Sequence, residues 1–519
     1  MSNTANFDFT IFDKAISPKQ DQQLEFISHI PDILSTFPNE WIEGQFVPFL
    51  TSWLPINDSK IVSALIPFVT QIAFSINSLE SLSPLVEAIV SGNIKDNNKE
   101  LASQISKIKI SRSTTSSKSD SQSITSLSLL SFLTKLAGSR FDCVRAFVPP
   151  LISSLKRDEQ QKTIVTSLVY DPSFHVRLEI AKIIPKLKSD TLSSQVAVTL
   201  ANDPEGQIRS IVAIISVKKS FFISNVLPKL ISDDDWSVRA SVAQELSNNK
   251  SYDLTLGNCI TLAKDKVWQV KLCALRSMAY IIKKSKDIKN SINEILNLLK
   301  DIIKFPQTSL KNAVIDAYLS LFKKVTKSSN DTALNLKDIN DFITNFIISQ
   351  PPQSKLHFLE KIVSSSKPQK ILNQIKSILF NIVKSLAEND QWRIRVGAIE
   401  ILQKLDLDDE QIKQFSALCL QMMKDDCTPV REASAKQYAL FILSTNFNGK
   451  LPKTVTELSK SDTFRKRQAA ILIMKTIALS QKISPNPYKD SMKSSIKKFL
   501  KDSCSNVVCY AQCAIEEIQ

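Results

Sequence analysis

The segment NDQWRIRVGAIEIL, residues 389–402, is one of six variants of a single phrase. The others are YDPSFHVRLEIAKII (170–184), NDPEGQIRSIVAII (202–215), DDDWSVRASVAQEL (233–246), KDKVWQVKLCAL (264–275) and KDDCTPVREASAKQ (424–437). In each variant an acid or amide is followed six residues later by a basic residue, and a Val or Ile precedes that basic residue. Such self-similarity is the sequence signature of a repeat protein.

The arginines mark the period of this repeat. The chain has 13 arginines, and seven of them lie at the basic position: Arg145, Arg177, Arg209, Arg239, Arg395, Arg431 and Arg467. With lysines added, the basic positions run 145, 177, 209, 239, 271, 311, 355, 395, 431 and 467. These intervals of 30–44 residues suit two helices and their turns. We count about 14 helix-turn-helix repeats and expect residues 1–519 to form a single curved solenoid.

The residue types in the phrase suggest how neighbouring repeats stack. The Asp or Asn is expected to cap the following helix, and the Val or Ile begins its apolar stripe. Alanines four residues after the arginine, at Ala181, Ala213, Ala243 and Ala435, allow close approach of helices. The planar fork of each arginine is expected to bond the turn carboxylate of the next repeat, forming a ladder.

Composition supports an all-α chain. Only seven glycines occur in 519 residues, whereas folds rich in strands and loops need many turn glycines. The N-terminus lacks a basic segment followed by an apolar one, and no apolar run approaches the roughly 18 to 20 residues that cross a bilayer. We expect a soluble intracellular protein without a membrane partner.

The sequence does not indicate an enzyme. Its three histidines are remote from one another, and phosphate-binding glycine loops and hydrolase motifs are missing. The eight cysteines form no CxxC pair, and we expect Cys509 and Cys513, which share a helix face, to be buried rather than to bind metal or act in redox chemistry. We therefore expect no catalytic residue, metal, cofactor or small-molecule substrate.

The segment SRSTTSSKSDSQSITS, residues 111–126, interrupts the repeats. Half of its residues are serine, and it has no apolar period. We interpret it as a flexible loop insertion between two repeats, with phosphorylation as an alternative role.

The phrase and its period resemble the HEAT repeat, and the order of the variants resembles the scaffold (A, or 65 kDa regulatory) subunit of protein phosphatase 2A. That family carries a turn of the form WRVR in its seventh and eleventh repeats. Here DWSVR (235–239) and QWRIR (391–395) lie in the seventh and eleventh units. VREAS (430–434), TFRKR (463–467) and QFVPFLTSWLPINDSK (45–60) also resemble family segments. The chain departs from the family in having about 14 repeats rather than 15 and a net charge of +15 rather than an acidic one.

The resemblance implies a non-catalytic scaffold of a Ser/Thr phosphatase holoenzyme. The catalytic subunit would dock on the C-terminal repeats, and exchangeable regulatory B-type subunits on the N-terminal ones. Residues implied to face the catalytic subunit are Trp392, Arg393, Arg395, Arg431, Phe464, Arg465 and Arg467. Residues implied to face regulatory subunits are Pro172, Arg177, Trp236 and Arg239.

Alternatives stay open at this point. The ladder alone accounts for Arg177, Arg239, Arg395 and Arg431 without any partner, whereas Trp392, Trp236 and Phe464 precede the buried stripe and suit a contact surface. Trp268 fits a core position better. A HEAT adaptor of the nuclear-transport kind is a second hypothesis, and a basic HEAT protein that binds nucleic acid is a third, although lysines dispersed along the chain favour a solvated surface. We expect the protein in the cytoplasm, with the nucleus as a further location.

Overall fold

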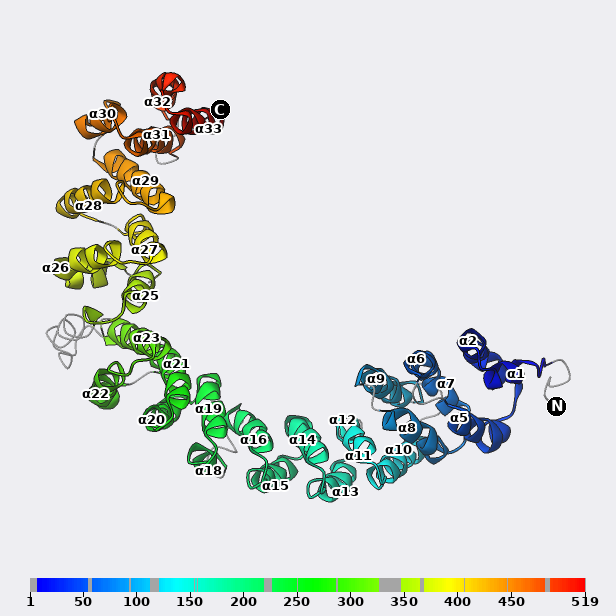
Figure 1. Ribbon diagram of the computed structural model, residues 1–519. Coiled ribbons are helices and arrows are strands. Elements are labelled where there is room, and N and C mark those ends of the chain that lie inside the picture. Colours follow the sequence, from blue (N-terminus) through cyan, green and yellow to red (C-terminus); the bar gives the residue numbers. More distant parts are fainter. Residues whose placement is uncertain are drawn as a thin grey trace. The chain divides into compact units, whose positions relative to one another are not determined.

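The computed structural model describes residues 7–518 apart from 55–57, 93–94, 113–120, 154, 156, 219–225, 250, 286–287, 326–346, 365–367, 406, 446 and 481–485. These residues form helices and turns, with no β-strand among them (Figure 1). The predicted all-α class is therefore confirmed. The chain divides into two compact units, Met1–Leu262 (unit 1) and Ala263–Gln519 (unit 2).

Unit 1 contains the helices of the N-terminal half. They are α1 (Ile11–Ile16), α2 (Gln20–Ser28), α3 (Ile30–Thr36), α4 (Asn39–Trp41), α5 (Val47–Trp53), α6 (Ser59–Leu65), α7 (Val69–Phe74), α8 (Ser83–Ser91), α9 (Lys95–Arg112), α10 (Ser121–Ala137), α11 (Asp142–Phe147), α12 (Pro149–Ile152), α13 (Asp158–Leu168), α14 (Phe174–Ile183), α15 (Asp190–Leu200), α16 (Gly206–Lys218), α18 (Leu227–Ile231), α19 (Trp236–Glu245) and α20 (Tyr252–Ala263).

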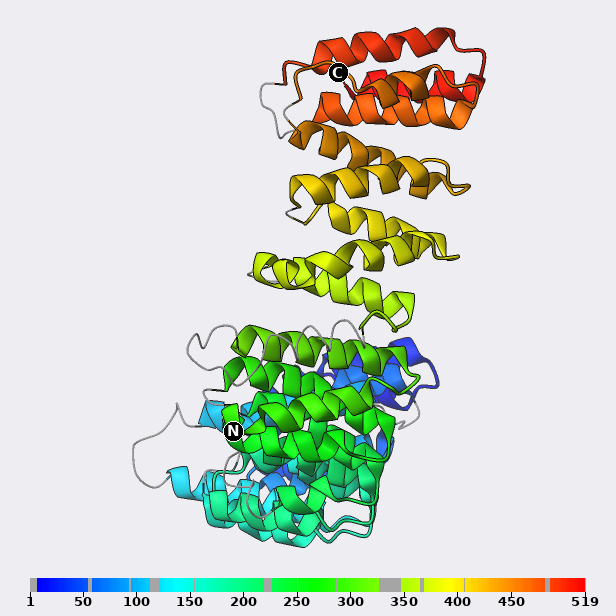
Figure 2. The same cartoon turned by 90° about the vertical axis from the view of Figure 1, so that its left-hand side faces the viewer.

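Unit 2 contains longer helices, which Figure 2 shows stacked as successive layers toward the C-terminus. They are α21 (Trp268–Lys284), α22 (Ile292–Ile302), α23 (Thr308–Val325), α25 (Pro352–Val363), α26 (Pro368–Ala387), α27 (Trp392–Leu402), α28 (Asp409–Met422), α29 (Thr428–Ser444), α30 (Lys453–Ser459), α31 (Phe464–Leu479), α32 (Lys489–Lys497) and α33 (Ser505–Glu517).

The repeated phrase spans the turn and the start of the second helix of a repeat. Helices α14, α16, α19, α21, α27 and α29 each begin three residues before their basic residue. The preceding Val or Ile is buried in every case: Val176, Ile208, Val238, Val270, Ile394 and Val430. The four alanines of the register are fully buried as well. The phrase thus inserts one apolar stripe per repeat into the core, as its spacing predicts.

Second helices of consecutive repeats pack on one another. In unit 1, α14 contacts α16, which contacts α19; in unit 2, α27, α29, α31 and α33 contact in sequence. A Cβ added at Gly206 would clash with the Asp235 carboxylate of the next repeat. Glycine at this position therefore leaves room for the Asp235 side chain.

The serine-rich segment predicted as a loop, 111–126, overlaps helix at both ends. Helix α9 ends at Arg112, and α10 begins at Ser121. The centre of the segment, 113–120, lies outside the described residues.

Candidate interaction surface on the repeat turns

Five arginines of the register form bidentate ion pairs with an aspartate of the next repeat. The pairs are Arg145–Asp171, Arg177–Asp203 and Arg209–Asp233 in unit 1, and Arg395–Asp425 and Arg467–Asp502 in unit 2. In each pair Nε lies 2.7 or 2.8 Å from Oδ2, and Nη2 donates to Oδ1. This is the fork geometry that only arginine offers a carboxylate. The predicted ladder is confirmed for these five ion pairs. We call the contact between a basic residue of the register and the turn of the next repeat a rung, and these five are complete rungs.

Each of these arginines also fastens its own turn. Arg177 donates from Nη1 to the carbonyl oxygens of Asp171, at 2.8 Å, and Pro172, at 3.1 Å. Arg209 and Arg395 repeat this arrangement in their own turns. One guanidinium therefore joins three backbone or side-chain groups of two successive turns, and few of its donors remain for a partner.

The turn aspartates close the turn rather than cap the helix, which corrects the expectation from sequence. Asp171 Oδ1 accepts the Ser173 N–H at 2.8 Å, and Ser173 itself is the residue that precedes α14. The carboxylate thus belongs to a residue three positions before the first residue of α14, and it closes an Asx turn. Burial alone would raise the pKa of Asp171, but the hydrogen bonds from Arg145 and the Ser173 N–H, together with the charges of Arg145 and Arg177, hold this pKa below its usual value.

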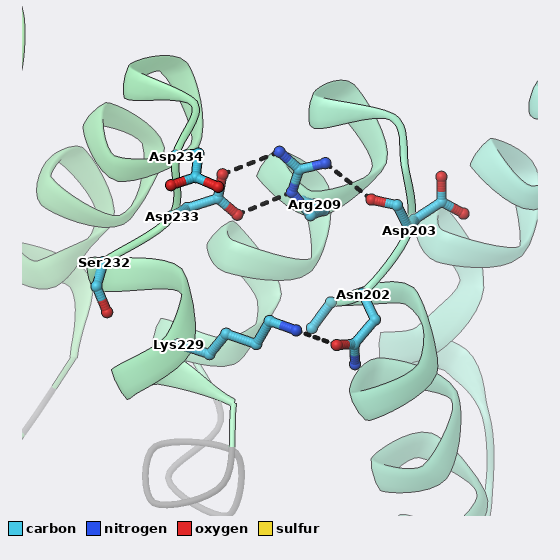
Figure 3. Close-up of a pocket in the computed structure, with 8 residues that line it drawn as sticks. Asn202, Asp203, Arg209, Lys229, Ser232, Asp233 and Asp234 are labelled. Atoms are coloured by element: carbon cyan, nitrogen blue, oxygen red, sulfur yellow. Dashed lines mark hydrogen bonds and ion pairs between the residues drawn. The ribbon is translucent and has the colours of Figure 1, made fainter.

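Figure 3 shows one rung and the polar hollow of about 380 Å³ beside it. Arg209 lies between the Asp203 carbonyl of its own turn and the Asp233 carboxylate of the next. Below them Lys229 donates to the Asn202 side chain, which ties the ends of α18 and α15. The hollow lies between the two turns that the rung connects. The charges of Arg209 and Asp233 on its wall are already paired with each other.

The rungs of unit 2 between residues 271 and 355 use different chemistry. Phe305 occupies the position of the turn aspartate, and the Lys271 ammonium lies 5.1 Å from the centre of its ring. Lys355 donates to Ser385 Oγ at 3.4 Å, a weak contact. Burial lowers the pKa of both lysines, and at Lys271 the charge of Asp265 offsets only part of this effect. A cation–π contact therefore replaces one ion pair.

Arg431 is buried and lacks a carboxylate partner among the described residues. Its Nη1 donates to the Asp425 and Asp426 carbonyl oxygens, each at 2.8 Å, as in the complete rungs. Its Nη2 turns to Thr428 Oγ1 of its own helix. Ser461 stands where the next repeat would supply the aspartate. The six-residue spacing back from Arg467 is the signal in the sequence that reveals this substitution.

Aromatic residues begin five of the described second helices and lie partly exposed on the turns: Phe174 in α14, Trp236 in α19, Trp268 in α21, Trp392 in α27 and Phe464 in α31. The side chain of Trp236 is 45% exposed and that of Phe464 36%, while Trp392 is half-buried. The Arg393 guanidinium lies 4.8 Å from the Trp392 ring centre, and Arg465 lies 5.9 Å from that of Phe464. Trp392 and Phe464 thus share one position in α27 and α31, each followed by an arginine.

The predicted contact residues fall into two groups. Arg177, Arg395 and Arg467 are engaged in ion pairs, and Arg239 is buried with its Nη1 bonded to the Asp233 and Asp234 carbonyl oxygens. Trp236, Trp392, Arg393, Phe464, Arg465 and Pro172 all reach the surface at least in part. Trp268 is half-buried, so it is neither a full core residue nor a fully free one.

Other reactive groups are scattered. Cys509 and Cys513 are exposed, which contradicts the expected burial, because α33 turns that face away from its neighbours. His357 contacts Asp316 at 3.2 Å across α23 and α25. Within the described residues no three His, Cys, Asp or Glu side chains are grouped to hold a metal ion. Nor does any helix of that part of the chain have the length and apolar character to cross a membrane.

This architecture is that of an all-α HEAT-repeat solenoid. No family model matches the sequence, and no curated protein gives a significant match. Among solved structures, the chain is similar to Kap121p bound to Pho4p, with a TM-score of 0.53 and 12% identity over 98% of this chain and 52% of that one. It is also similar to Kap121p bound to Ste12p, with a TM-score of 0.52 and 11% identity over 97% of this chain and 56% of that one.

A third similar structure is the Kap95:Nup1 complex, with a TM-score of 0.47 and 13% identity over 98% of this chain and 70% of that one. The chain spans about half the length of Kap121p. At these identities the likeness to Kap121p establishes the HEAT-repeat fold and leaves the partner to be inferred from the surface.

Proposed function

We propose that the chain is the non-catalytic scaffold subunit of a protein phosphatase 2A-like holoenzyme. The observation that carries this proposal is the repeated aromatic-arginine pair at the start of α27 and α31, Trp392 with Arg393 and Phe464 with Arg465. An exposed ring beside a cation offers the apolar area and the hydrogen-bond donors that concentrate binding energy in protein interfaces. The resemblance of these two turns to those of the scaffold family supports the catalytic subunit as their partner.

The proposal assigns separate roles to neighbouring arginines. Arg393 and Arg465 lie outside the ladder register, so stacking of the repeats does not require them. Arg395 and Arg467 hold the turns that present the rings, and Arg431 holds the turn of the repeat between them. In unit 1, Trp236 and Pro172 would meet regulatory B-type subunits, supported by Arg177 and Arg239.

Capture of a recombinant phosphatase catalytic subunit by the full chain tests the proposal. Replacing Trp392 and Arg393 with Ala is expected to weaken capture at least about 30-fold, because truncating an anchor residue typically removes about 2 to 4 kcal/mol of affinity. Helix content should not change, because neither residue belongs to the buried stripe.

Arg140 and Phe141 provide a matched control. They form a similar exposed pair, 4.6 Å apart, but lie in unit 1. Their double alanine variant should capture the catalytic subunit like the wild type. If the wild type fails to capture it, or if both double variants bind equally well, the assignment is wrong.

An adaptor for other protein cargo is the second candidate, and the fold shared with Kap121p favours it. The net charge of +15 argues against basic cargo of the kind that acidic adaptors receive. Affinity purification from the native cell distinguishes the two, because recovery of cargo without phosphatase subunits would support the adaptor. A salt titration on duplex DNA or RNA tests the nucleic-acid alternative, which requires affinity that falls steeply with salt.

A further inference from the structure

The incomplete rung at Arg431 has a preformed place for an anion. In the five complete rungs, the arginine holds its own turn through Nη1 and offers Nε and Nη2 to a carboxylate. Arg431 holds its own turn in the same way, at 2.8 Å to both carbonyl oxygens. Its fork has no carboxylate, and the residue is only 8% exposed. A buried guanidinium without a counter-charge is costly, and an oxyanion at this point would relieve that cost.

The corresponding turn of the next repeat, where Ser461 stands six residues before Arg467, has the same backbone arrangement as the turns that carry aspartate. Arg467 Nη1 donates to the Ser461 carbonyl oxygen at 2.8 Å and to that of Asp462 at 3.0 Å. The Ser461 hydroxyl accepts the Thr463 N–H at 3.3 Å, which reproduces the bond that Asp425 makes to the Cys427 N–H. Ser461 therefore fulfils one role of the aspartate, closing the turn, and lacks only its charge.

We propose that Ser461 is a phosphorylation site and that its phosphate completes the rung with Arg431. A protein kinase would transfer the γ-phosphoryl group of a nucleoside triphosphate to Ser461 Oγ. The new P–O bond replaces the bond to the β-phosphate, the nucleoside diphosphate leaves, and the hydroxyl proton passes to the kinase base. Phosphoserine supplies a double negative charge and several acceptor oxygens for the planar arginine fork.

The surroundings of Ser461 suit both the kinase and the product. Lys460, Asp462 and Thr463 are exposed, so the segment is accessible at the surface. Arg465, on the same turn, contacts the fully exposed Asp426 of the preceding repeat at 3.2 Å. That surface pair is a weak link across these two turns, and a phosphate beside it would add a stronger one. Modification would thus stiffen the repeats that carry Phe464 and Arg465.

Phosphoserine incorporated at position 461 of the full chain tests the rung directly. Hydrogen exchange of the 461–463 turn is expected to slow about three- to tenfold, because a charge-assisted bond on a partly exposed turn is worth on the order of 1 kcal/mol. Arg431→Gln should abolish the slowing, and Arg431→Lys should keep only part of it. Phosphoserine at Ser503, in the next turn, is the matched control and should leave the 461–463 turn unchanged.

Two results would overturn the proposal. One is equal slowing in the Arg431→Gln variant, which would mean that the phosphate acts without this arginine. The other is the absence of phosphate at Ser461 when the protein is purified from its native cell and analysed by mass spectrometry. Neither measurement involves a phosphatase subunit, so failure here leaves the proposed scaffold function untouched.

Discussion

Consecutive repeats stack in unit 1 and at the start of unit 2, but different side chains connect their turns in the two regions. In unit 1, a buried aspartate of the next repeat forms an ion pair with each of Arg145, Arg177 and Arg209. Lys271 instead faces the ring of Phe305, and Lys355 has only a serine hydroxyl. The apolar stripe is present in both regions. Burial of apolar surface therefore holds the repeats together, and the ion pair fixes which turns align.

The residue choice follows from the shape of the two cations. Arginine stands where the next repeat offers an acid, as Asp171, Asp203 and Asp233 do, because only its planar fork engages both carboxylate oxygens. Lysine stands where the next repeat offers Phe305 or Asn389. Arg431, which faces Ser461, departs from this pattern, and a phosphate on the serine would remove the exception.

The largest expected effect comes from breaking a carboxylate rung. Asp203→Ala should lower the free energy of local opening by about 2 to 4 kcal/mol, because it leaves Arg177 half-buried without a counter-charge. Native-state hydrogen exchange of α14 and α16 measures this loss. Asp203→Asn is the matched control, since the amide can still close the turn and should recover part of the stability.

An equal loss from Phe305→Ala, measured in α21 and α23, would contradict the distinction between the two regions. That ring is 37% exposed and faces a single ammonium, so it should contribute less than the buried carboxylate.

A smaller effect is expected from changing the helix spacing beside a rung. Gly206→Ala should destabilise the stack by about 1 to 2 kcal/mol, because the new methyl group displaces the Asp235 side chain that caps α19. Gly257→Ala is the control, because an exposed methyl there meets nothing within 4 Å. It should stabilise α20 by about 0.5 to 1 kcal/mol. Urea unfolding of the full chain compares them, and matching signs would refute the spacing argument.

Phe305→Leu should have a smaller effect than Gly206→Ala. It keeps the apolar bulk and removes the electron-rich face of the ring above which the Lys271 ammonium lies. The expected loss is about 0.5 to 1 kcal/mol, the usual size of an exposed cation–π contact. Urea unfolding of this variant in a Lys271→Met background isolates the contact, because the loss should disappear there. A loss of the same size in both backgrounds would show that the ring acts by packing alone.

Much of the fold was readable from the sequence because one phrase recurs with its spacing intact. The six-residue step from acid to base predicted the rungs, and the buried Val or Ile predicted the stripe. The features that the sequence did not reveal depend on how the side chains of one repeat are oriented toward the neighbouring repeat. Asp171 lies three residues ahead of the first residue of the helix that it was expected to cap. Cys509 and Cys513 face outward although their spacing suits a buried stripe.

The candidate contact residues were predictable only in part for the same reason. A turn phrase places Trp392 and Phe464 at helix starts, but it does not say how much of each ring the neighbouring repeat covers. Long-range contacts, such as the bond from Tyr510 to Glu432 across 78 residues, have no local signal in the sequence. Burial, together with that bond, raises the pKa of Tyr510 to about 12.

The smallest effect is expected at alkaline pH, where only the region with lysine rungs should change in stability. Burial lowers the pKa of Lys271 below its usual 10.5, so the charged form is penalised in the folded chain. As pH rises through the lowered value toward 10.5, the folded chain loses this proton before the unfolded chain does, and the penalty disappears. The bond to Asp203 raises the pKa of Arg177, so that rung stays charged throughout. Stability measured between pH 8 and 10 should therefore improve for the wild type relative to Lys271→Arg, whose guanidinium cannot release its proton in this range. A constant difference between the two proteins across that range would mean that Lys271 is solvated well enough to keep its charge.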